Sequence, residues 1–312
     1  MMLDEKLLHS RLVEPGLIAR LVRVESAGST NAELDEAAKA EDFAQKWPHL
    51  SVLTAEEQTS GRGRMSRTWQ SPKGSTLSTS ILLRPTLPKD QWHWLNLAAG
   101  LALVTALQGH GVPAALKWPN DVEVAGRKIA GMLAVVPSAD PSAVILGCGI
   151  NVLQTGDQLP TPTSTSLWLE QRRVGGDPPA PETEEAAGLR TQLLADWLEA
   201  FVQLMRQAQG EAGVGEAGGG EAGMAGLRSR IAAAISTIGE AVRVELPNGT
   251  AVRGRALGTD RHGALEVEVT ARRRTVLDAE AGGGPEELWE AHTPAREAYS
   301  AGDVVHLRPT QG

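Results

Sequence analysis

The chain has 312 residues, of which 41% are hydrophobic and 22% charged, as in an ordinary globular protein with a buried core and about two domains. Its formal net charge of −8 at pH 7 argues against a general attraction to nucleic acid or to anionic membranes, so any anion site must be built from local positive charge. A single cysteine excludes an internal disulfide, and the seven histidines have no metal-ligand spacing.

The single cysteine fits a reducing cytoplasm, and the alternative is a cysteine-poor secreted protein. The N-terminal part of the chain predicts short elements. Residues 1–22 predict one short helix, and the charges that interrupt them exclude a signal peptide. A strand is expected at 22–24, followed by a turn at 26–31 and a helix at 32–46, which is rich in good helix formers. No apolar run approaches the ~18 residues of a membrane span, so we expect no membrane segment.

The middle of the chain predicts a mixed sheet with one buried helix. Residues 59–76 are expected to form a polar loop, and residues 91–110 predict a strongly apolar helix that is buried on most sides. Short strands are expected at 51–55, 76–83, 122–127, 129–136 and 143–152, and another short strand is expected to end at Lys117. This mixture of strands, hairpins and helices indicates an α+β fold and not repeated βαβ units.

Residues 154–235 predict helices that alternate with irregular segments. Residues 189–207 predict an amphipathic helix, preceded by an irregular Pro/Thr/Gly-rich segment at 154–188. The Gly/Ala/Glu tract at 208–226 cannot bury enough apolar surface to order itself, so we expect a flexible insertion there. A helix is expected to resume at 227–235.

The C-terminal part predicts a small β-domain. Short strands with an Asn-Gly hairpin turn at 248–249 are typical of a small β-barrel. A Gly-rich and Glu-rich stretch near 280–300 is expected to be an insertion before the last strand. We therefore expect two domains, at 1–236 and 237–312.

A positively charged segment at 59–74, TSGRGRMSRTWQSPKG, holds four basic residues and no acid. Gly61 and Gly63 free the backbone for close approach, and exposed N–H groups can then line an anion. Arg62 and Arg64 can bind a carboxylate or a phosphate through two parallel hydrogen bonds. The alternative is a solvated basic loop, and charge alone leaves both interpretations open. The segment lacks the GxxxxGK[ST] pattern of a P-loop.

Other segments carry weaker signals. Lys117 ends a short strand and could meet an anion, and Asp121 could hold Mg²⁺, whereas the alternative for residues 117–121 is a surface turn. Gly131 inside an apolar strand indicates close approach of a ligand or of another backbone. For Cys148, a buried core position is favoured. The Ser-Thr-Asn triplet at 29–31 predicts a helix N-cap at Thr30 or Asn31, which is compatible with a second role.

The order and spacing of these segments together resemble the biotin–protein ligase family. The resemblance covers about residues 22–152 by motif and extends more weakly to Gly-Asp-Val-Val-His-Leu-Arg at 302–308. The matching motifs are Ser-Thr-Asn at 29–31, Gln58 before Gly-Arg-Gly-Arg at 61–64, Trp69 with Ser-Pro-x-Gly at 71–74, Lys-Trp-Pro-Asn-Asp at 117–121, Arg-Lys-x-x-Gly at 127–131 and Gly-x-Gly-Ile-Asn at 147–151. The fold that this implies is a mixed-sheet α+β catalytic domain related to class II aminoacyl-tRNA synthetases, followed by an SH3-like C-terminal barrel.

The resemblance implies a ligase that uses ATP, Mg²⁺ and biotin. Biotin carboxylate would attack the α-phosphate of ATP, giving biotinyl-5′-AMP and pyrophosphate. A lysine of a biotin carboxyl carrier protein, from acetyl-CoA carboxylase or a related carboxylase, would then displace AMP. Counter-charge placed between two anions would provide the catalysis, without a protein nucleophile.

The resemblance also assigns residues to the two substrates. Lys117, Arg64 and Arg62 are the expected catalytic charges, and Asp121 would hold Mg²⁺. The biotin site would comprise Ser29, Thr30, Asn31, Gln58, Arg62, Gly63, Arg64, Lys117 and Gly131, and the nucleotide side would comprise Arg67, Trp69, Asn120 and Asn151. The Gly-rich segment 61–74 is a candidate for a mobile lid that protects the adenylate from water.

Two features depart from the family pattern. About 22 residues precede the catalytic motifs, too few for the helix-turn-helix module of some members, so we expect no DNA binding. Met65-Ser66 stands where the basic loop often continues with Arg-Gly, which puts loop closure in doubt. The nearest alternative is a lipoate or octanoate ligase of the same fold, and a less favoured one is a biotin-responsive regulator. A homodimer is compatible with the sequence.

Overall fold

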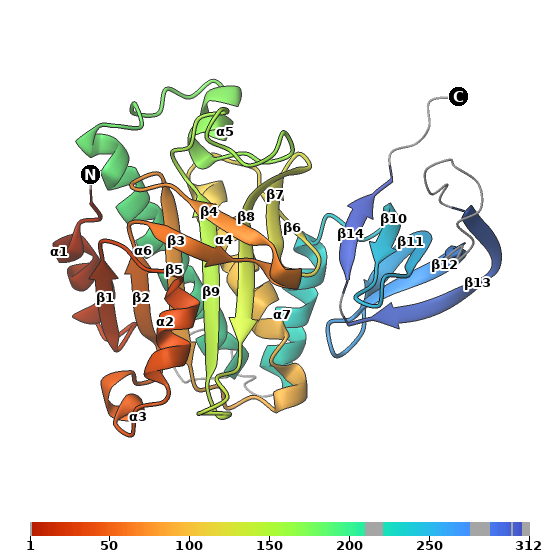
Figure 1. The fold of residues 1–312 in the computed structure, drawn as a ribbon, viewed down its shortest axis with the longest axis horizontal. Coiled ribbons are helices and arrows are strands. Elements are labelled where there is room, and N and C mark those ends of the chain that lie inside the picture. The colour runs from red at the N-terminus through yellow and green to blue at the C-terminus, as the bar shows by residue number, and fades with distance from the viewer. Residues whose placement is uncertain (1, 210–220, 275–287, 301, 308–312) are drawn as a thin grey trace, which may run out of the picture. The chain divides into compact units, whose positions relative to one another are not determined.

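The chain divides into two compact units, each with its own sheet (Figure 1). The computed structural model describes residues 2–209, 221–274, 288–300 and 302–307. Unit 1 comprises Met1–Leu116 and Asn120–Ile231, and unit 2 comprises Lys117–Pro119 and Ala232–Gly312. The expected domain boundary at 236/237 stays a prediction. The three residues of unit 2 that come from the middle of the chain were not expected from the sequence.

The core of unit 1 is a seven-stranded mixed sheet in the order β1-β2-β5-β9-β8-β7-β6. Strands β1 and β2 pair in parallel, and the pairs from β2 through β5, β9 and β8 to β7 are antiparallel. The strands are β1 (Arg20–Val24), β2 (Ser51–Ala55), β5 (Thr76–Leu83), β6 (Ala115–Lys117), β7 (Asp121–Val124), β8 (Arg127–Val135) and β9 (Val144–Asn151). With its helices, this sheet confirms the α+β class, and β2 and β5 have the predicted bounds.

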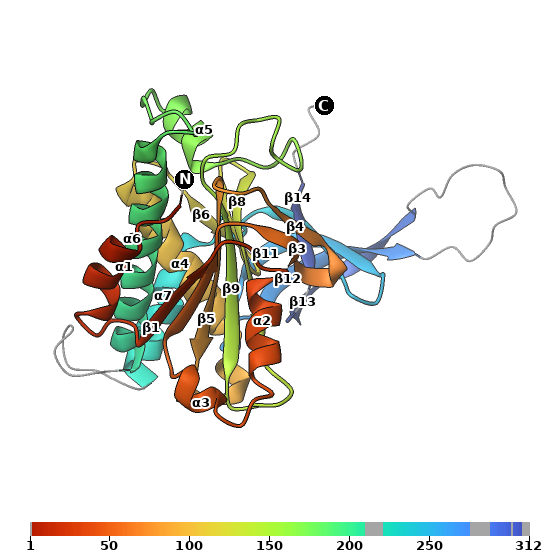
Figure 2. The same cartoon turned by 60° about the vertical axis from the view of Figure 1, so that its left-hand side comes forward.

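Helices cover both faces of this sheet (Figure 2). On one face, α4 (Trp94–Gly109) lies against β7 and β8 and packs on α6 (Glu184–Gln209). Because α4 is apolar on nearly all sides, it is buried between the sheet and α6, as predicted. On the opposite face, α2 (Thr30–Ala37) lies against β2, β5 and β9. This face carries the candidate site.

Several predicted segments of unit 1 differ in the structure. The helix expected at 32–46 is two helices, α2 and α3 (Phe43–Lys46), and Ser29 takes the N-cap position that Thr30 or Asn31 was expected to hold. The loop expected at 59–76 contains two paired strands, β3 (Gln58–Arg62) and β4 (Thr68–Ser71), joined by a 3₁₀ turn. The N-terminal helix is a short α1 (Glu5–Leu8) that continues as a π-helical turn.

The helical region after β9 is also more regular than expected. Segment 154–188 contains α5 (Leu167–Arg173), which starts where Ser166 accepts a hydrogen bond from the N–H of Leu169. Of the tract at 208–226, residues 221–226 belong to α7 (Glu221–Ala234), because Met224, Leu227 and Ile231 bury one face of that helix. Residues 210–220 lie outside the described residues. No helix in the described part of the chain is long and apolar enough to cross a membrane.

Unit 2 contains a five-stranded antiparallel sheet in the order β13-β12-β11-β10-β14. Its strands are β10 (Ala241–Glu245), β11 (Ala251–Thr259), β12 (Leu265–Arg274), β13 (Leu288–Tyr299) and β14 (Asp303–His306). The insertion expected at 280–300 is therefore wrong for residues 288–299, which pair with β12. This edge strand keeps most side chains exposed, so it shows no apolar alternation in the sequence. Residues 280–287 lie outside the described residues.

Candidate functional site

Three glycines on β8 and β9 leave one area of the central sheet without side chains on these two strands. Gly131 on β8 is opposite Gly149 on β9, and Gly149 is opposite Ser78 on β5. Two residues along β9, Gly147 is opposite Ser80. Glycine inside a strand weakens packing unless another group approaches the backbone closely. The register therefore indicates a shallow platform in the sheet.

Side chains from other segments lie directly on this platform. A Cβ at Gly149 would be 2.3 Å from Cε2 of Trp69, and a Cβ at Gly147 would be 2.4 Å from Oδ1 of Asn31. Both distances are far below a real carbon contact, so any other residue at either position would force the neighbouring side chain to move. The indole Nε1 of Trp69 is buried without a hydrogen-bond partner in the described part of the chain. A buried indole donor usually finds a partner, so this atom points to a ligand or a water on the platform.

A neutral polar cluster borders the platform at the start of α2. The backbone N–H of Thr30 donates to Oε1 of Gln58 at 2.9 Å, and its hydroxyl donates to the same atom at 3.2 Å. The Ser80 hydroxyl lies 2.6 Å from Oγ1 of Thr30 and 2.7 Å from Oδ1 of Asn31. Asn31 also donates to the carbonyl of Leu133 at 2.9 Å. These fixed donors and acceptors carry no charge, so they suit an uncharged polar ligand group.

Ser80 was missed by the sequence analysis, although a signal existed. Every residue of β5 is buried, and Thr76, Ser78 and Ser80 share one face of it. A polar stripe on a fully buried strand must face polar partners, because an unpaired buried hydroxyl is costly. Ser78 bonds Ser71 of β4 at 2.7 Å, whereas Oγ1 of Thr76 has no partner in the described residues. This stripe points toward a polar site.

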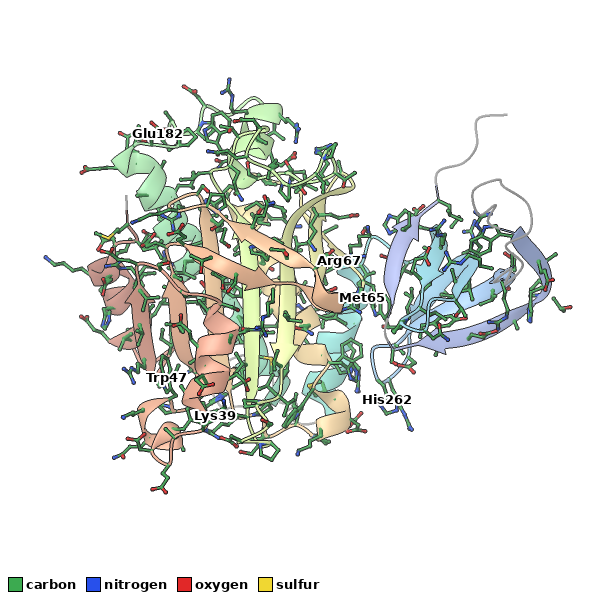
Figure 3. The ribbon with its side chains drawn as sticks, in the orientation of Figure 1. Lys39, Trp47, Met65, Arg67, Glu182 and His262 are labelled. Carbon is green, nitrogen blue, oxygen red and sulfur yellow. The ribbon has the colours of Figure 1, made fainter. Side chains whose placement is uncertain are left out.

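The basic hairpin of β3 and β4 brings positive charge to the same face. Nη1 of Arg64 donates to Oδ1 of Asn120 at 2.9 Å, and Asn120 in turn donates to the carbonyl of Met132 at 2.7 Å. Arg62 and Arg67 are exposed. Figure 3 shows Met65 and Arg67 at the tip of the hairpin. The structure thus brings together Arg64, which was assigned to the biotin side, and Asn120, which was assigned to the nucleotide side, in a geometry that holds the guanidinium in place.

An ion pair that the sequence analysis did not predict lies beside Trp69. Nζ of Lys128 is 2.7 Å from Oδ1 of Asp121 and 5.7 Å from the centre of a Trp69 ring. A Cβ at Gly131 would be 3.1 Å from the same Nζ, so this ammonium stands over the platform. The signal was the Arg-Lys-x-x-Gly motif, in which the glycine leaves the room that the lysine occupies. Asp121, the expected Mg²⁺ ligand, is therefore bound to a cation of the chain itself.

The remaining predicted residues have more separate places. Asn151 is 3% exposed and donates to the carbonyl of Thr165 at 3.0 Å, while its Oδ1 accepts from Gln154 at 3.0 Å, so it holds the segment after β9. Gly63 donates to the carbonyl of Arg67 at 2.7 Å within the hairpin turn. Lys117 is half-buried at the end of β6 and belongs to unit 2.

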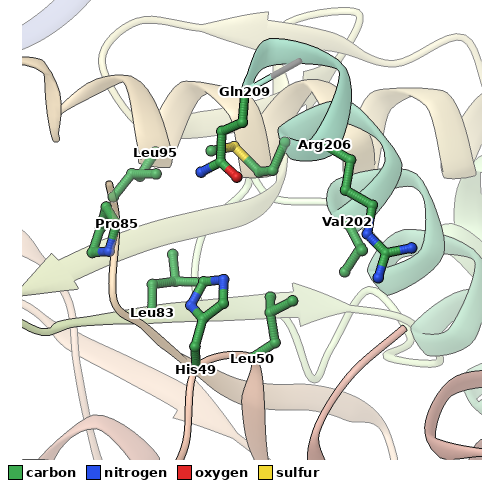
Figure 4. Close-up of a pocket in the computed structure, with 9 residues that line it drawn as sticks. His49, Leu50, Leu83, Pro85, Leu95, Val202, Arg206 and Gln209 are labelled. Atoms are coloured by element: carbon green, nitrogen blue, oxygen red, sulfur yellow. The ribbon is translucent and has the colours of Figure 1, made fainter. Parts of the chain in front are cut away.

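A different pocket of unit 1 contains none of these residues (Figure 4). It has a volume of about 190 Å³. Its walls are mostly apolar, from Leu83, Leu95 and Val202 among others, and His49 and Arg206 add polar groups. Arg206 donates to the carbonyl of Gly16 at 3.2 Å. The described residues contain no group of three or more His, Cys, Asp or Glu side chains that could hold a metal, here or at the platform.

Comparisons with known proteins agree with one another. Residues 24–151 match the model of the biotin/lipoate A/B protein ligase family, and residues 237–307 match the biotin protein ligase C terminal domain. A biotin–[acetyl-CoA-carboxylase] ligase of Mycobacterium tuberculosis (strain ATCC 25618 / H37Rv) is 36% identical over 98% of this chain and 96% of its own. A protein of the same description from Paracoccus denitrificans is 32% identical over 73% of this chain and 88% of its own.

A solved structure shares the fold. The biotin protein ligase from Aquifex aeolicus in complex with biotin and ATP superposes with a TM-score of 0.63 at 23% identity, covering 93% of this chain and 99% of its own. The likeness extends over both the mixed sheet and the small antiparallel sheet.

Proposed function

This chain belongs to the biotin/lipoate A/B protein ligase family, and from that premise we propose that it acts as a biotin–[acetyl-CoA-carboxylase] ligase. Biotin and ATP are its substrates, and biotinyl-5′-AMP is the intermediate. A carboxyl carrier protein receives the biotinyl group. The observation that carries the proposal is the glycine platform, which lies between a neutral polar cluster and a basic hairpin on one face of the sheet.

The platform and the neutral cluster form the biotin site. The ureido group of biotin needs donors and acceptors without charge, and Ser29, Thr30 and Gln58 supply them in fixed positions. Asn31 orders the cluster through Ser80. Gly131 would leave room for the fused rings of biotin to lie against the sheet once the Lys128 ammonium, which now stands over it, moves aside.

The basic hairpin holds the two anions that must react. Two unit charges 4 Å apart repel by roughly 4 kcal/mol at an effective dielectric constant of about 20. That repulsion corresponds to about three decades in rate. Arg62, Arg64 and Lys117 reduce it by placing positive charge beside the biotin carboxylate and the α-phosphate. The N–H group of Arg64 would bind the carboxylate, and that of Gly63 would join it after giving up its hydrogen bond to the carbonyl of Arg67. Arg64 is oriented in advance by Asn120.

The nucleotide lies on the side of Arg67, Trp69, Asn120 and Asn151. Arg67 supplies charge for the phosphates, and Trp69 a flat surface beside the platform. The platform residues do not form a protein cage for Mg²⁺, which ordinarily keeps several waters and binds through phosphates and one or two carboxylates. Asp121 would be the protein ligand, after exchanging its contact with Lys128 for the ion. Mg²⁺ would supply further positive charge at the phosphates.

The two steps need no nucleophile from the protein. In the first, a biotin carboxylate oxygen bonds to the α-phosphorus, and pyrophosphate leaves. In the second, the amine of the carrier lysine attacks the acyl carbon, the bond to AMP breaks, and the amine loses a proton. Side chains of the chain orient the reactants and balance charge.

Transfer of labelled biotin to a carrier domain tests this function. The wild-type chain should label the carrier lysine only with ATP present, and Arg64→Ala and Lys117→Ala should each lose on the order of 100-fold in rate. A parallel ATP–pyrophosphate exchange assay should respond to biotin and not to lipoate or octanoate. Exchange that depends on lipoate or octanoate would show that this acid, and not biotin, is the substrate.

A further inference from the structure

Three residues from the middle of the chain belong to the C-terminal unit. Lys117–Pro119 group with Ala232–Gly312, although Lys117 is the last residue of β6, and β6 and the next strand, β7, both belong to the large sheet. The central residue of this segment, Trp118, is 2% exposed. The residue before it is the lysine to which the proposed function gives a catalytic charge.

Two hydrogen bonds join Trp118 to other residues of unit 2. Its indole Nε1 donates to the carbonyl of Gly263 at 2.9 Å, and its backbone N–H donates to Oγ1 of Thr237 at 3.3 Å. Thr237 is fully buried, and its hydroxyl also lies 3.2 Å from Nε2 of His306. The indole and the backbone of Trp118 are thus both held by residues far away in the sequence.

The Gly263 carbonyl, which accepts the hydrogen bond from the indole, lies in a turn that is closed by several hydrogen bonds. Gly263 has a φ of +78°, and its N–H donates to the carbonyl of Asp260 at 3.0 Å. The carboxylate of Asp260 accepts from the N–H groups of His262 and Ala264 at 2.8 and 3.0 Å. This turn gives the indole a fixed acceptor.

Such an anchor matters because a lysine side chain has many rotamers and a compact charge. The peptide between residues 117 and 118 joins the lysine to the anchored tryptophan, so the anchor limits where the lysine Cα can lie. Misplacing a catalytic group by about 1 Å can cost about 100-fold in rate.

We propose that Trp118 and Thr237 are positioning residues for Lys117, whose charge acts in the first reaction step, in which no carrier protein takes part. The proposal rests on the proposed function of Lys117.

The first test replaces one hydrogen-bond donor. Trp118→Phe keeps an aromatic ring but removes the donor to Gly263, and biotin-dependent ATP–pyrophosphate exchange should lose on the order of tenfold in kcat or more. The matched control is Trp197→Phe: Trp197 is equally buried and donates to the carbonyl of Ala99 at 3.0 Å. The control variant should keep the wild-type kcat even if its Tm falls as far as that of Trp118→Phe. Equal losses of kcat in both variants would overturn the proposal.

A double-mutant cycle with Lys117→Ala separates positioning from packing. If Trp118 acts through Lys117, Trp118→Phe should change the rate little in the Lys117→Ala background. The same fold-loss in both backgrounds would overturn the positioning role. Wild-type exchange by Lys117→Ala itself would instead reject the catalytic role of Lys117, and the proposal with it, while biotin transfer by that variant would leave the ligase function standing.

Thr237 gives a second route if Trp118→Phe does not fold. Thr237→Val removes the hydroxyl that receives the Trp118 N–H and should lower kcat, whereas Thr237→Ser keeps the hydroxyl and should restore it. Equal kcat for the serine and valine variants would contradict the role of this hydroxyl.

Discussion

At position 149, glycine leaves room for an indole where any other residue would place at least a methyl group. The same holds at position 147 for an asparagine amide, whereas at position 131 a lysine ammonium lies farther away, 3.1 Å from where a Cβ would be. Side chains from β4, α2 and the start of β8 therefore converge on bare backbone. The platform is a property of single residues, and it can be tested one residue at a time.

Gly149→Ala should displace Trp69 and weaken biotin binding. The new Cβ would lie 2.3 Å from Cε2 of Trp69, so the ring must move. We expect a loss of roughly 1–3 kcal/mol in stability and a rise in the biotin Kd measured by calorimetry. Gly156→Ala is the control, because no atom lies within 4 Å of a Cβ there. An unchanged Kd in Gly149→Ala would mean that Trp69 does not border the biotin site.

Cys148 should be unreactive in the folded protein. It is the single cysteine of the chain, and burial raises the pKa of its thiol well above the ordinary value of 9.0. A thiol that stays protonated and buried is a poor nucleophile. Iodoacetamide labelling at pH 8 should be slow without denaturant and complete in denaturant, as read by mass spectrometry. Rapid labelling of the native chain would contradict the buried position.

At the scale of elements, ion pairs join segments that the hydrophobic pattern does not connect. Arg127 at the start of β8 binds Glu170 of α5 through two hydrogen bonds of 3.0 Å each. Burial opposes ionisation of Glu170, but the hydrogen bonds from Arg127 and Thr165 outweigh it and lower the pKa of this carboxyl below its usual 4.5. The contact ties α5 to the strand that carries Lys128 and Gly131.

The depressed pKa of Glu170 predicts an acid-sensitive contribution to stability. Because the unfolded chain binds this proton more tightly, the contribution is complete well above pH 4.5 and is lost as the pH falls through and below that value. Glu170→Gln should therefore lower the free energy of urea unfolding at pH 7 and flatten its decline between about pH 5 and pH 3. The exposed Glu182, seen in Figure 3, gives the control Glu182→Gln. If the free energy of unfolding depends on pH in the same way in wild type and Glu170→Gln, Glu170 does not cause the acid sensitivity.

At the scale of the whole molecule, the charge is negative while the site is locally positive. A net charge of −8 repels polyanions such as DNA. The few arginines of the hairpin supply enough positive charge to bind a small anionic ligand but not the many phosphates of a duplex. We expect no binding of duplex DNA in fluorescence anisotropy up to about 10 μM protein at physiological salt. Binding that weakens as salt is raised would contradict this and favour a regulatory role.

Local chemistry determined much of this protein. The alternation in β5 and the apolar run in α4 report burial of neighbouring residues, so both elements were predicted correctly from the sequence. The spacing of the Gly-Arg-Gly-Arg, Lys-Trp-Pro-Asn-Asp and Gly-x-Gly-Ile-Asn motifs was enough to indicate the family. These motifs placed Arg64 and Asn120 in one site, but the sequence did not predict the hydrogen bond between them.

Only the tertiary structure decided which distant residues meet. Ser80 meets Thr30 and Asn31 because α2 packs on β5, and Trp69 of β4 lies on Gly149 of β9 although the two are far apart in the sequence. Trp118 belongs to the C-terminal unit because its partners lie more than a hundred residues along the chain. A periodic pattern shows that a side chain is buried, but the partner it is buried against depends on how the whole chain folds.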